Sequence, residues 1–294
     1  MTESTTKKSA CVVINPISGG KNKGPILEII NRYFPKHIQY EIFHLKANGQ
    51  DELTKKIRSG NFDIVVAAGG DGTINQVAQA VIGTQSALAI IPLGSGNGLA
   101  RHLNIPLDTK GAVELIGTGR EIKMDACTVN NNYFFCTSGI GFDALIGKLF
   151  AESKVRGFFT YLKLTVTNFF NYKPQPYNLI IDGKTVSTYA FLVTFANASQ
   201  YGNDAFIAPQ ADISDGFIDV VILKPFRIWN GLALAIKIFN KTLHTSKFVD
   251  VHKGQHISVA RGSSGPVHFD GEPSEMEATV HYQILHKAVK VLVP

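Results

Sequence analysis

The chain has 294 residues, a hydrophobic fraction of 45% and a formal net charge of +6 from 29 basic and 23 acidic residues. Length divided by about 150 predicts two domains, and the absence of any block of like charges excludes a nucleic-acid-binding arm. Three cysteines without C-x-x-C spacing argue against a disulfide framework or a zinc site, so we expect each to be a small core residue.

The first 125 or so residues predict strands that alternate with helices. The strands are expected at residues 10–14, 38–45, 62–68 and 87–91, and the helices at 25–33, 51–59, 75–82 and within 106–116. This alternation predicts a Rossmann-like parallel sheet with helices on both faces. In such sheets ligands bind at the carboxyl ends of the strands.

From Lys123 onward the sequence predicts mainly short strands separated by turn signals. They are expected at residues 124–129, 133–138, 178–181, 185–197, 218–223, 255–260, 266–270, 279–285 and 289–293. Two helical insertions, at about 142–171 and 228–241, interrupt them. We therefore predict an α/β nucleotide-binding domain over residues 1–125 and an antiparallel β-sandwich domain over residues 126–294.

The polar start of the chain and its first apolar run, residues 10–14, do not resemble a signal peptide. The sequence has no run of 18 apolar residues, so no membrane-spanning helix is expected. These features predict a cytoplasmic location.

The most informative motif follows the apolar run 62–68 and reads Gly69-Gly70-Asp71-Gly72-Thr73-Ile74-Asn75. Glycines let backbone N–H groups approach a ligand closely, and the helix that follows adds unsatisfied donors. We expect the Thr73 hydroxyl to cap this helix. The motif matches neither G-x-x-x-x-G-K-[ST] nor G-x-G-x-x-G, and a plain tight turn is the alternative.

Two more small-residue loops follow predicted strands of the first half. They are Asn15-Pro16-Ile17-Ser18-Gly19-Gly20 and Pro92-Leu93-Gly94-Ser95-Gly96-Asn97-Gly98. Three such loops on one sheet edge favour a ligand rich in phosphate. In the second half, Asp270-Gly271-Glu272 is either a plain hairpin turn or a carboxylate aimed at substrate. The segment from Asp212 to Phe217 is either a capped turn or a loop that binds a hard cation.

In this order, these motifs resemble the diacylglycerol kinase catalytic-domain family, which includes soluble bacterial lipid kinases and sphingosine kinases. The resemblance extends from about Ala10 to Val293. It implies a nucleotide-binding α/β domain, a β-sandwich domain and an active site in the cleft between them. It also implies ATP as phosphoryl donor, Mg²⁺ as cofactor and a lipid alcohol as acceptor.

The resemblance also assigns roles to individual residues. Glu272 would be the proton acceptor, and Asp71 and Asp125 would support the catalytic magnesium or the incoming hydroxyl. A structural magnesium would be held by Asp215 with the main-chain carbonyls of Asp212 and Phe217. The nucleotide would contact residues of all three loops, namely Asn15, Gly69, Gly70, Asp71, Gly72, Thr73, Ile74, Asn75, Gly94, Ser95 and Asn97.

Gly98 stands where the bacterial enzymes usually carry a carboxylate, and Leu45 where a nucleotide-contacting threonine is often found. The second loop is therefore closer to the sphingosine and ceramide kinase version. Diacylglycerol, a sphingoid base, ceramide and other glycerolipids all remain open as acceptors. The oligomeric state is open as well, with a homodimer as one alternative. The rival interpretations are an NAD kinase and a non-catalytic nucleotide-binding module.

A lipid kinase with no spanning helix must reach its substrate at the membrane, here by peripheral association with the inner face. Two stretches, residues 156–163 and 168–173, mix aromatic and basic side chains. They are expected either to pack on the sandwich or to dock at a lipid interface. Trp229 and the run 232–239 carry the same two interpretations.

Overall fold

The computed structural model describes residues 7–16, 24–153 and 158–294 and divides into two compact units. Unit 1 comprises Met1–Met124 and Lys287–Pro294, and unit 2 comprises Asp125–His286. Residues 287–294 belong to unit 1 and not to the second domain, where the sequence analysis placed them. The reason is that the end of strand β16 (Thr279–Val293) pairs in parallel with β4 (Ala87–Pro92).

Unit 1 is built on a parallel sheet, as the sequence predicts. Its strands follow the order β2 (Ile38–His44), β1 (Lys8–Ile14), β3 (Ile64–Gly69) and β4, with the end of β16 beside β4. Every residue of β3 and β4 is buried, which requires both faces of the sheet to be covered.

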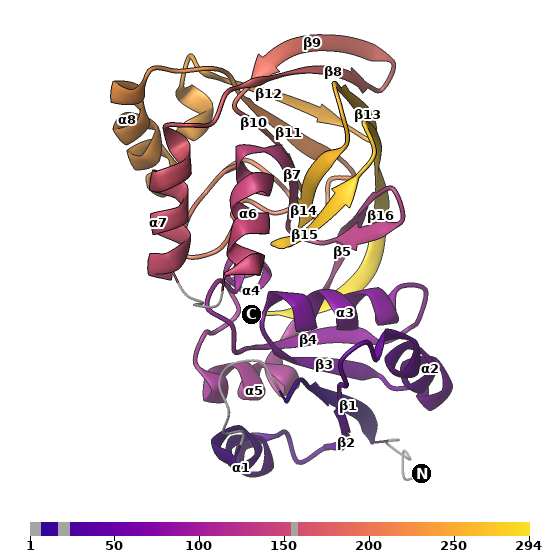
Figure 1. The fold of residues 1–294 in the computed structure, drawn as a ribbon. Helices are drawn as coiled ribbons and strands as arrows, with labels where there is room; N and C mark the ends of the chain where they lie inside the picture. The colour runs from indigo at the N-terminus through magenta and orange to yellow at the C-terminus, as the bar shows by residue number, and fades with distance from the viewer. Residues whose placement is uncertain (1–6, 17–23, 154–157) are drawn as a thin grey trace. The chain divides into compact units, whose positions relative to one another are not determined.

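Four helices provide this cover. Helices α1 (Gly24–Tyr33) and α5 (Thr109–Thr118) lie on one face, and α2 (Gln50–Gly60) and α3 (Asp71–Val81) on the other (Figure 1). A short helix that the sequence analysis missed, α4 (Gly98–His102), follows β4.

Unit 2 contains two antiparallel sheets. The six-stranded sheet has the order β12 (Val249–Gly254), β11 (Ile218–Leu223), β10 (Leu192–Ala196), β7 (Thr137–Gly141), β14 (Gly265–Phe269) and β15 (Glu272–Met276). The other is formed by the first half of β16, β13 (His256–Arg261), β8 (Gln175–Ile181) and β9 (Lys184–Ala190), and the hairpin of β5 (Arg120–Val129) and β6 (Asn132–Phe134) accompanies it.

Alternate residues of β10 show how the sandwich is packed. Val193 and Phe195 enter a buried cluster with residues of the other sheet, and the Phe195 ring stacks on Tyr282 with the ring centroids 3.6 Å apart. Leu192 and Ala196 point the other way, into a second cluster with Phe142 of α6 (Phe142–Glu152). The two-residue period of the strand thus fills two cores, and the predicted β-sandwich is confirmed.

Several elements differ from the predicted ones. The expected strand 185–197 is two strands, β9 and β10, which belong to different sheets. The first helical insertion is two helices, α6 and α7 (Phe158–Phe169), and the second is α8 (Ile228–Phe239), which a short 3-10 helix, η1 (Leu243–Thr245), follows. The two strands expected over 279–293 are the single strand β16, in which Lys287 has a φ of 53°.

Cys11, Cys127 and Cys136 are buried free thiols, as expected of small core residues. None of the helices in the described part of the chain is both long and apolar enough to cross a bilayer.

Candidate functional site

The glycine turn lies at the carboxyl end of β3, where a ligand of a parallel sheet is expected. The N-cap residue of α3 is Gly70, which has no side chain to accept the first N–H groups of the helix. The prediction that Thr73 caps this helix is therefore wrong. Its side chain instead covers Gly69, where an added Cβ would lie 2.4 Å from the Thr73 Cβ, and its Oγ1 lies 3.1 Å from Asn15 Nδ2, which donates to it.

Asp71 connects the glycine turn to the loop after β4. Its Oδ2 accepts a hydrogen bond from the Asn97 N–H at 3.0 Å, and its Oδ1 accepts one from the Gly98 N–H at 2.9 Å. The carboxylate thereby satisfies donors at the start of α4. Burial raises the pKa of Asp71, and the N–H groups of Gly98 and Asn97 oppose that rise because they stabilise the charged form.

The backbones of the two loops are in direct contact at a pair of glycines. A Cβ added at Gly94 would lie 2.8 Å from the Gly70 Cα, so a side chain there would force the loops apart. Asn97, in the left-handed conformation with a φ of 51°, closes the second loop. Its Oδ1 accepts from the Gly94 N–H and its Nδ2 donates to the Gly94 carbonyl, both at 2.9 Å.

The structure thus brings together most of the residues predicted to bind the nucleotide. Asn15 reaches the glycine turn through Thr73, and Ser95 is exposed on the second loop. Ile74 and Asn75 are buried within α3, so their side chains support the helix. Residues 17–20 of the first predicted loop lie outside the described residues.

The donor set of this corner fits the phosphates of ATP. The first turn of α3 presents backbone N–H groups that its glycine N-cap does not satisfy, and these donors together with the helix dipole favour an anion. Asp71, the carboxylate within the turn, is directed to the start of α4. The negative charge of Asp71 is therefore stabilised by backbone N–H groups.

In unit 2 the Asp-Gly-Glu motif forms the tight turn between β14 and β15. Asp270 and Gly271 both have positive φ, 48° and 86°, as a two-residue hairpin requires. The Asp270 carboxylate accepts from the N–H groups of Phe135, Cys136 and Thr137 at 2.8, 2.8 and 3.1 Å. These bonds fix the turn to the segment between β6 and β7, and Glu272 is exposed beside it.

Asp125 lies in unit 2 against the loop of residues 212–217. Its Oδ2 accepts from the Gly216 N–H at 2.7 Å, and its Oδ1 lies 2.9 Å from Nδ1 of His286. Asp125 is fully buried, so these two partners compensate for its loss of hydration. The sequence analysis did not anticipate His286, which lies just beyond a predicted strand.

The predicted structural magnesium site contains a lysine that sequence reasoning missed. Lys253 of β12 places its Nζ 2.6 Å from Asp215 Oδ2 and 3.4 Å from Asp219 Oδ2. Burial opposes the charged form of Lys253, but the hydrogen bond that Lys253 donates to Asp215 and the negative charge of Asp219 outweigh this effect and raise the pKa of Lys253. The other Asp215 oxygen accepts from the Phe217 N–H, and Asp212 accepts from Ser214.

Lys253 therefore supplies the positive charge at the position where the resemblance implies a metal ion. The Asp215 carboxylate, paired with Lys253 and bonded to the Phe217 N–H, fits an ammonium group.

We expect the melting temperature of the protein to be unchanged by EDTA or Mg²⁺, because Lys253 already neutralises Asp215. Lys253→Met would leave the buried Asp219 without its counter-ion and lower the free energy of unfolding by about 1–3 kcal/mol. Lys224→Met is the control, because it removes a more exposed pair with Asp250 and is expected to cost less than about 1 kcal/mol. An EDTA-induced loss of stability that Mg²⁺ restores would contradict this assignment.

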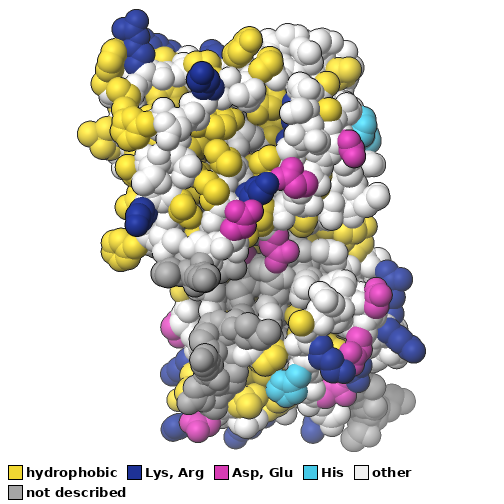
Figure 2. Space-filling view, in the orientation of Figure 1, with side chains coloured by type: hydrophobic (Ala, Val, Ile, Leu, Met, Phe, Trp, Pro, Cys, Tyr) yellow, Lys and Arg dark blue, Asp and Glu magenta, His cyan; other side chains and the backbone are white. Residues whose placement is uncertain are grey.

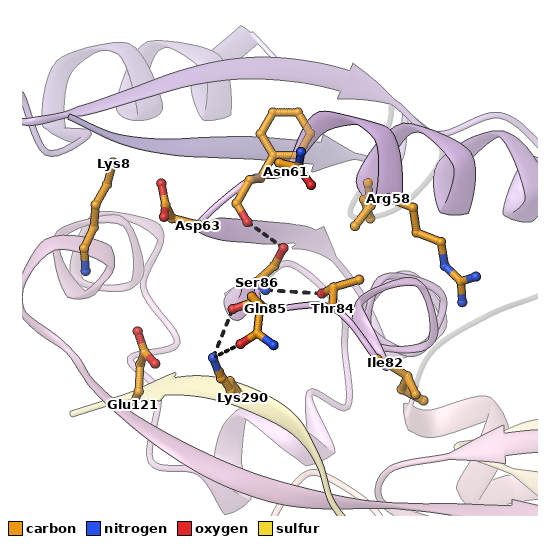
Figure 3. A pocket seen from close by; sticks show the side chains of 13 residues that line it. Lys8, Arg58, Asn61, Asp63, Ile82, Thr84, Gln85, Ser86, Glu121 and Lys290 are labelled. Carbon is orange, nitrogen blue, oxygen red and sulfur yellow. Dashed lines mark hydrogen bonds between the residues drawn. The ribbon is translucent and has the colours of Figure 1, made fainter. Parts of the chain in front are cut away.

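A pocket of about 690 Å³ lies at the opposite, amino ends of the unit 1 strands (Figure 3). Its lining includes Lys8, Asp63, Glu121 and Lys290, of which Lys290 donates to Gln85 Oε1 at 2.9 Å. Cations and carboxylates are mixed here, and among the described residues no glycine turn follows a strand at this edge. The candidate site is therefore the corner formed by the glycine loops and not this pocket.

Both units resemble domains of known proteins. Residues 9–129 match the family model of the diacylglycerol kinase catalytic domain, and residues 137–293 match that of the YegS C-terminal NAD kinase beta sandwich-like domain. A diacylglycerol kinase of Bacillus subtilis is 26% identical, with 98% of this chain and 97% of that protein covered. A probable YegS-like lipid kinase of Shewanella frigidimarina is 24% identical over 80% of this chain and 77% of that protein.

A crystal structure of a putative diacylglycerol kinase from Bacillus anthracis has a TM-score of 0.77 at 22% identity, covering 98% of this chain and 97% of that one, and shows the same fold. A 26% identical protein of Synechocystis sp. is longer, and the chain spans 66% of its length. The two family models together account for both units. The chain therefore belongs to the family of diacylglycerol kinase-like and YegS-like lipid kinases.

Proposed function

We propose that the protein transfers the γ-phosphoryl group of ATP to the hydroxyl group of a lipid such as a diacylglycerol or a sphingoid base. The observation that carries this proposal is the corner at which Asp71 joins the two glycine loops beside the uncapped start of α3. Such a corner supplies backbone donors for a polyphosphate. The membership of the chain in a lipid kinase family supports the choice of acceptor.

In the proposed reaction the lipid hydroxyl oxygen attacks the γ-phosphorus, the bond to the bridging oxygen breaks, and ADP leaves. Glu272 accepts the hydroxyl proton, a role that suits an exposed carboxylate on a turn held rigidly by Asp270. The N–H groups at the start of α3 orient the phosphates, and the exposed Ser95 hydroxyl contributes from the second loop. Phosphoryl transfer depends mainly on such positioning and on charge neutralisation.

Magnesium would enter this site with ATP, held mostly by phosphate oxygens and water, and would spread the charge that develops during transfer. Asp71 and Asp125 were expected to support it. Both oxygens of Asp71 accept backbone N–H groups, and both oxygens of Asp125 are bound by Gly216 and His286. We propose that the chain holds the metal through the nucleotide, and that the lipid is reached by peripheral contact with the inner face of the membrane.

The test is a phosphorylation screen with γ-labelled ATP and Mg²⁺ against diacylglycerol, sphingosine, ceramide and NAD, with products identified by mass spectrometry. A phosphorylated lipid is the expected product. Formation of NADP would instead make the chain an NAD kinase. Nucleotide binding without transfer to any acceptor would make it a non-catalytic module.

A further inference from the structure

Helices α7 and α8 of unit 2 are apolar on two faces. Their inner faces pack against the buried cluster beside the six-stranded sheet, through Leu164 and Phe169 of α7 and Leu234 and Ile238 of α8. This packing accounts for the expectation that these stretches cover the sandwich. It leaves the opposite faces unexplained, because a surface helix ordinarily carries polar side chains there.

The outer faces carry large exposed hydrophobic side chains at helical spacing. On α7 and just after it these are Phe159, Leu162, Val166 and Phe170, and on α8 they are Ile228, Trp229, Leu232, Ile236 and Phe239. Trp229 is 68% exposed and Leu232 is 73% exposed. Spacings of three and four residues place each set on one side of its helix.

The two outer faces belong to neighbouring helices. A Cβ added at Gly231 of α8 would lie 3.8 Å from the ring of Phe169 in α7, and the Phe169 ring centroid is 5.6 Å from that of Phe226, which precedes α8. Figure 2 shows hydrophobic side chains gathered over the part of unit 2 where Figure 1 labels α7 and α8. We call the nine exposed hydrophobic residues the α7–α8 face. Contiguous exposed apolar surface of this kind marks an interaction site.

The charges carried by the two segments that contain α7 and α8 have one sign. No aspartate or glutamate occurs between Glu152 and Asp182 or between Asp219 and Asp250, the two segments that contain these helices. The described cations of these segments that are exposed are Lys163, Lys173, Arg227, Lys241 and Lys247. The Arg227 guanidinium lies 5.3 Å from the centre of the Trp229 ring. Arg156 and Gly157, also in a stretch that mixes aromatic and basic residues, lie outside the described residues.

We propose that the α7–α8 face docks on the surface of an anionic lipid bilayer, with its hydrophobic side chains among the acyl chains and its cations at the head groups. Apolar side chains on segments whose charged residues are all cations match that interface. A second copy of this chain fits less well, because a symmetric contact would bring the same cations together. The choice of a bilayer rests on the proposed function, which requires access to a lipid.

The test uses Trp229, the only tryptophan of the chain, as its reporter. Vesicles of phosphatidylcholine with and without phosphatidylglycerol are added to the purified protein. We expect co-sedimentation and a blue shift of the Trp229 emission with phosphatidylglycerol vesicles, both weakened by salt. The double variant Leu232→Gln and Ile236→Gln keeps the reporter, and we expect its partition to fall by at least about tenfold.

Three further double variants keep the test specific, and two of them are controls. Ile180→Gln with Tyr189→Gln removes two exposed hydrophobic side chains from β8 and β9 of the same unit and is expected to leave partition unchanged. Lys163→Gln with Lys241→Gln is expected to weaken binding only to the anionic vesicles. Lys55→Gln with Lys184→Gln changes the net charge equally and is expected to bind as the unmodified protein does.

Absence of vesicle binding by the unmodified protein, or equal binding by Leu232→Gln with Ile236→Gln, would overturn the proposal. The proposal would also be overturned if the unmodified protein formed a concentration-dependent dimer, the double variant did not, and neither protein bound vesicles. Turnover on a short-chain diacylglycerol dispersed as monomers separates the docking proposal from the proposed function. The double variant is expected to retain this turnover, because a monomeric substrate requires no bilayer. Vesicle binding without phosphorylation of any lipid would refute the proposed function and not the docking face.

Discussion

Replacing Glu272 by alanine is expected to lower turnover by about 10²–10⁴-fold, the usual effect of losing a general base. The affinity for ATP should stay near its original value, because Glu272 belongs to the hairpin of unit 2 and not to the glycine loops. Glu272→Gln should lose as much activity, since an amide of the same shape cannot accept the proton. The measurements are kcat with the preferred lipid and the Kd for ATP.

The control for Glu272 is Glu275→Ala. Glu275 is an exposed carboxylate of the same strand, and its ion pair with Lys148, at 2.6 Å, is at the surface. Its removal should leave turnover unchanged, because surface pairs contribute little to stability. If Glu272→Ala weakened ATP binding as much as turnover, Glu272 would be a nucleotide contact or a structural residue and not the base.

Replacing Asp71 by alanine is expected to abolish activity. The two N–H groups of Asn97 and Gly98 would lose their shared acceptor, and the second loop would no longer be fixed to the glycine turn. We expect ATP binding to fall with turnover and the free energy of unfolding to fall by about 1–3 kcal/mol. Calorimetric titration with ATP and thermal unfolding of the same preparation measure both effects.

Asp108→Ala is the control, because it also removes a carboxylate that accepts a backbone N–H group at the start of a helix. Asp108 caps α5 in the same unit, with its carboxylate accepting from the Gly111 N–H at 2.8 Å. Its replacement should lower stability comparably and leave ATP binding intact. Near-normal turnover of purified Asp71→Ala would remove Asp71 from the functional site, whatever the change in its stability.

The fold could be predicted largely because its signals are local. Buried runs such as Ile64–Gly69, followed by glycine and a helical pattern, specify a strand and a helix within a few residues. Boundaries were missed where tertiary pairing decides them. Phe191 separates β9 from β10 although the sequence there is continuously strand-like, because the two strands join different sheets.

The site was predictable only in part for the same reason. The glycine loops can be recognised from their composition. The hydrogen bonds of Asp71 could not be predicted, because they are made to the start of α4, and a helix of five residues leaves little pattern in the sequence. Lys253 was missed because its pairing with Asp219 depends on the register of β11 with β12, a strand that was not predicted. His286 reaches Asp125 over a long sequence separation, and nothing in its own neighbourhood marks it.

The return of residues 287–294 to the sheet of unit 1 has a consequence for synthesis of the protein. While the ribosome is still producing unit 2, β4 has no β16 beside it, and its buried backbone edge is open to pairing with other chains. Unit 1 can complete its sheet only after the whole of unit 2 has been translated. A nascent chain stalled within unit 2 would therefore be prone to aggregate through the open sheet of unit 1.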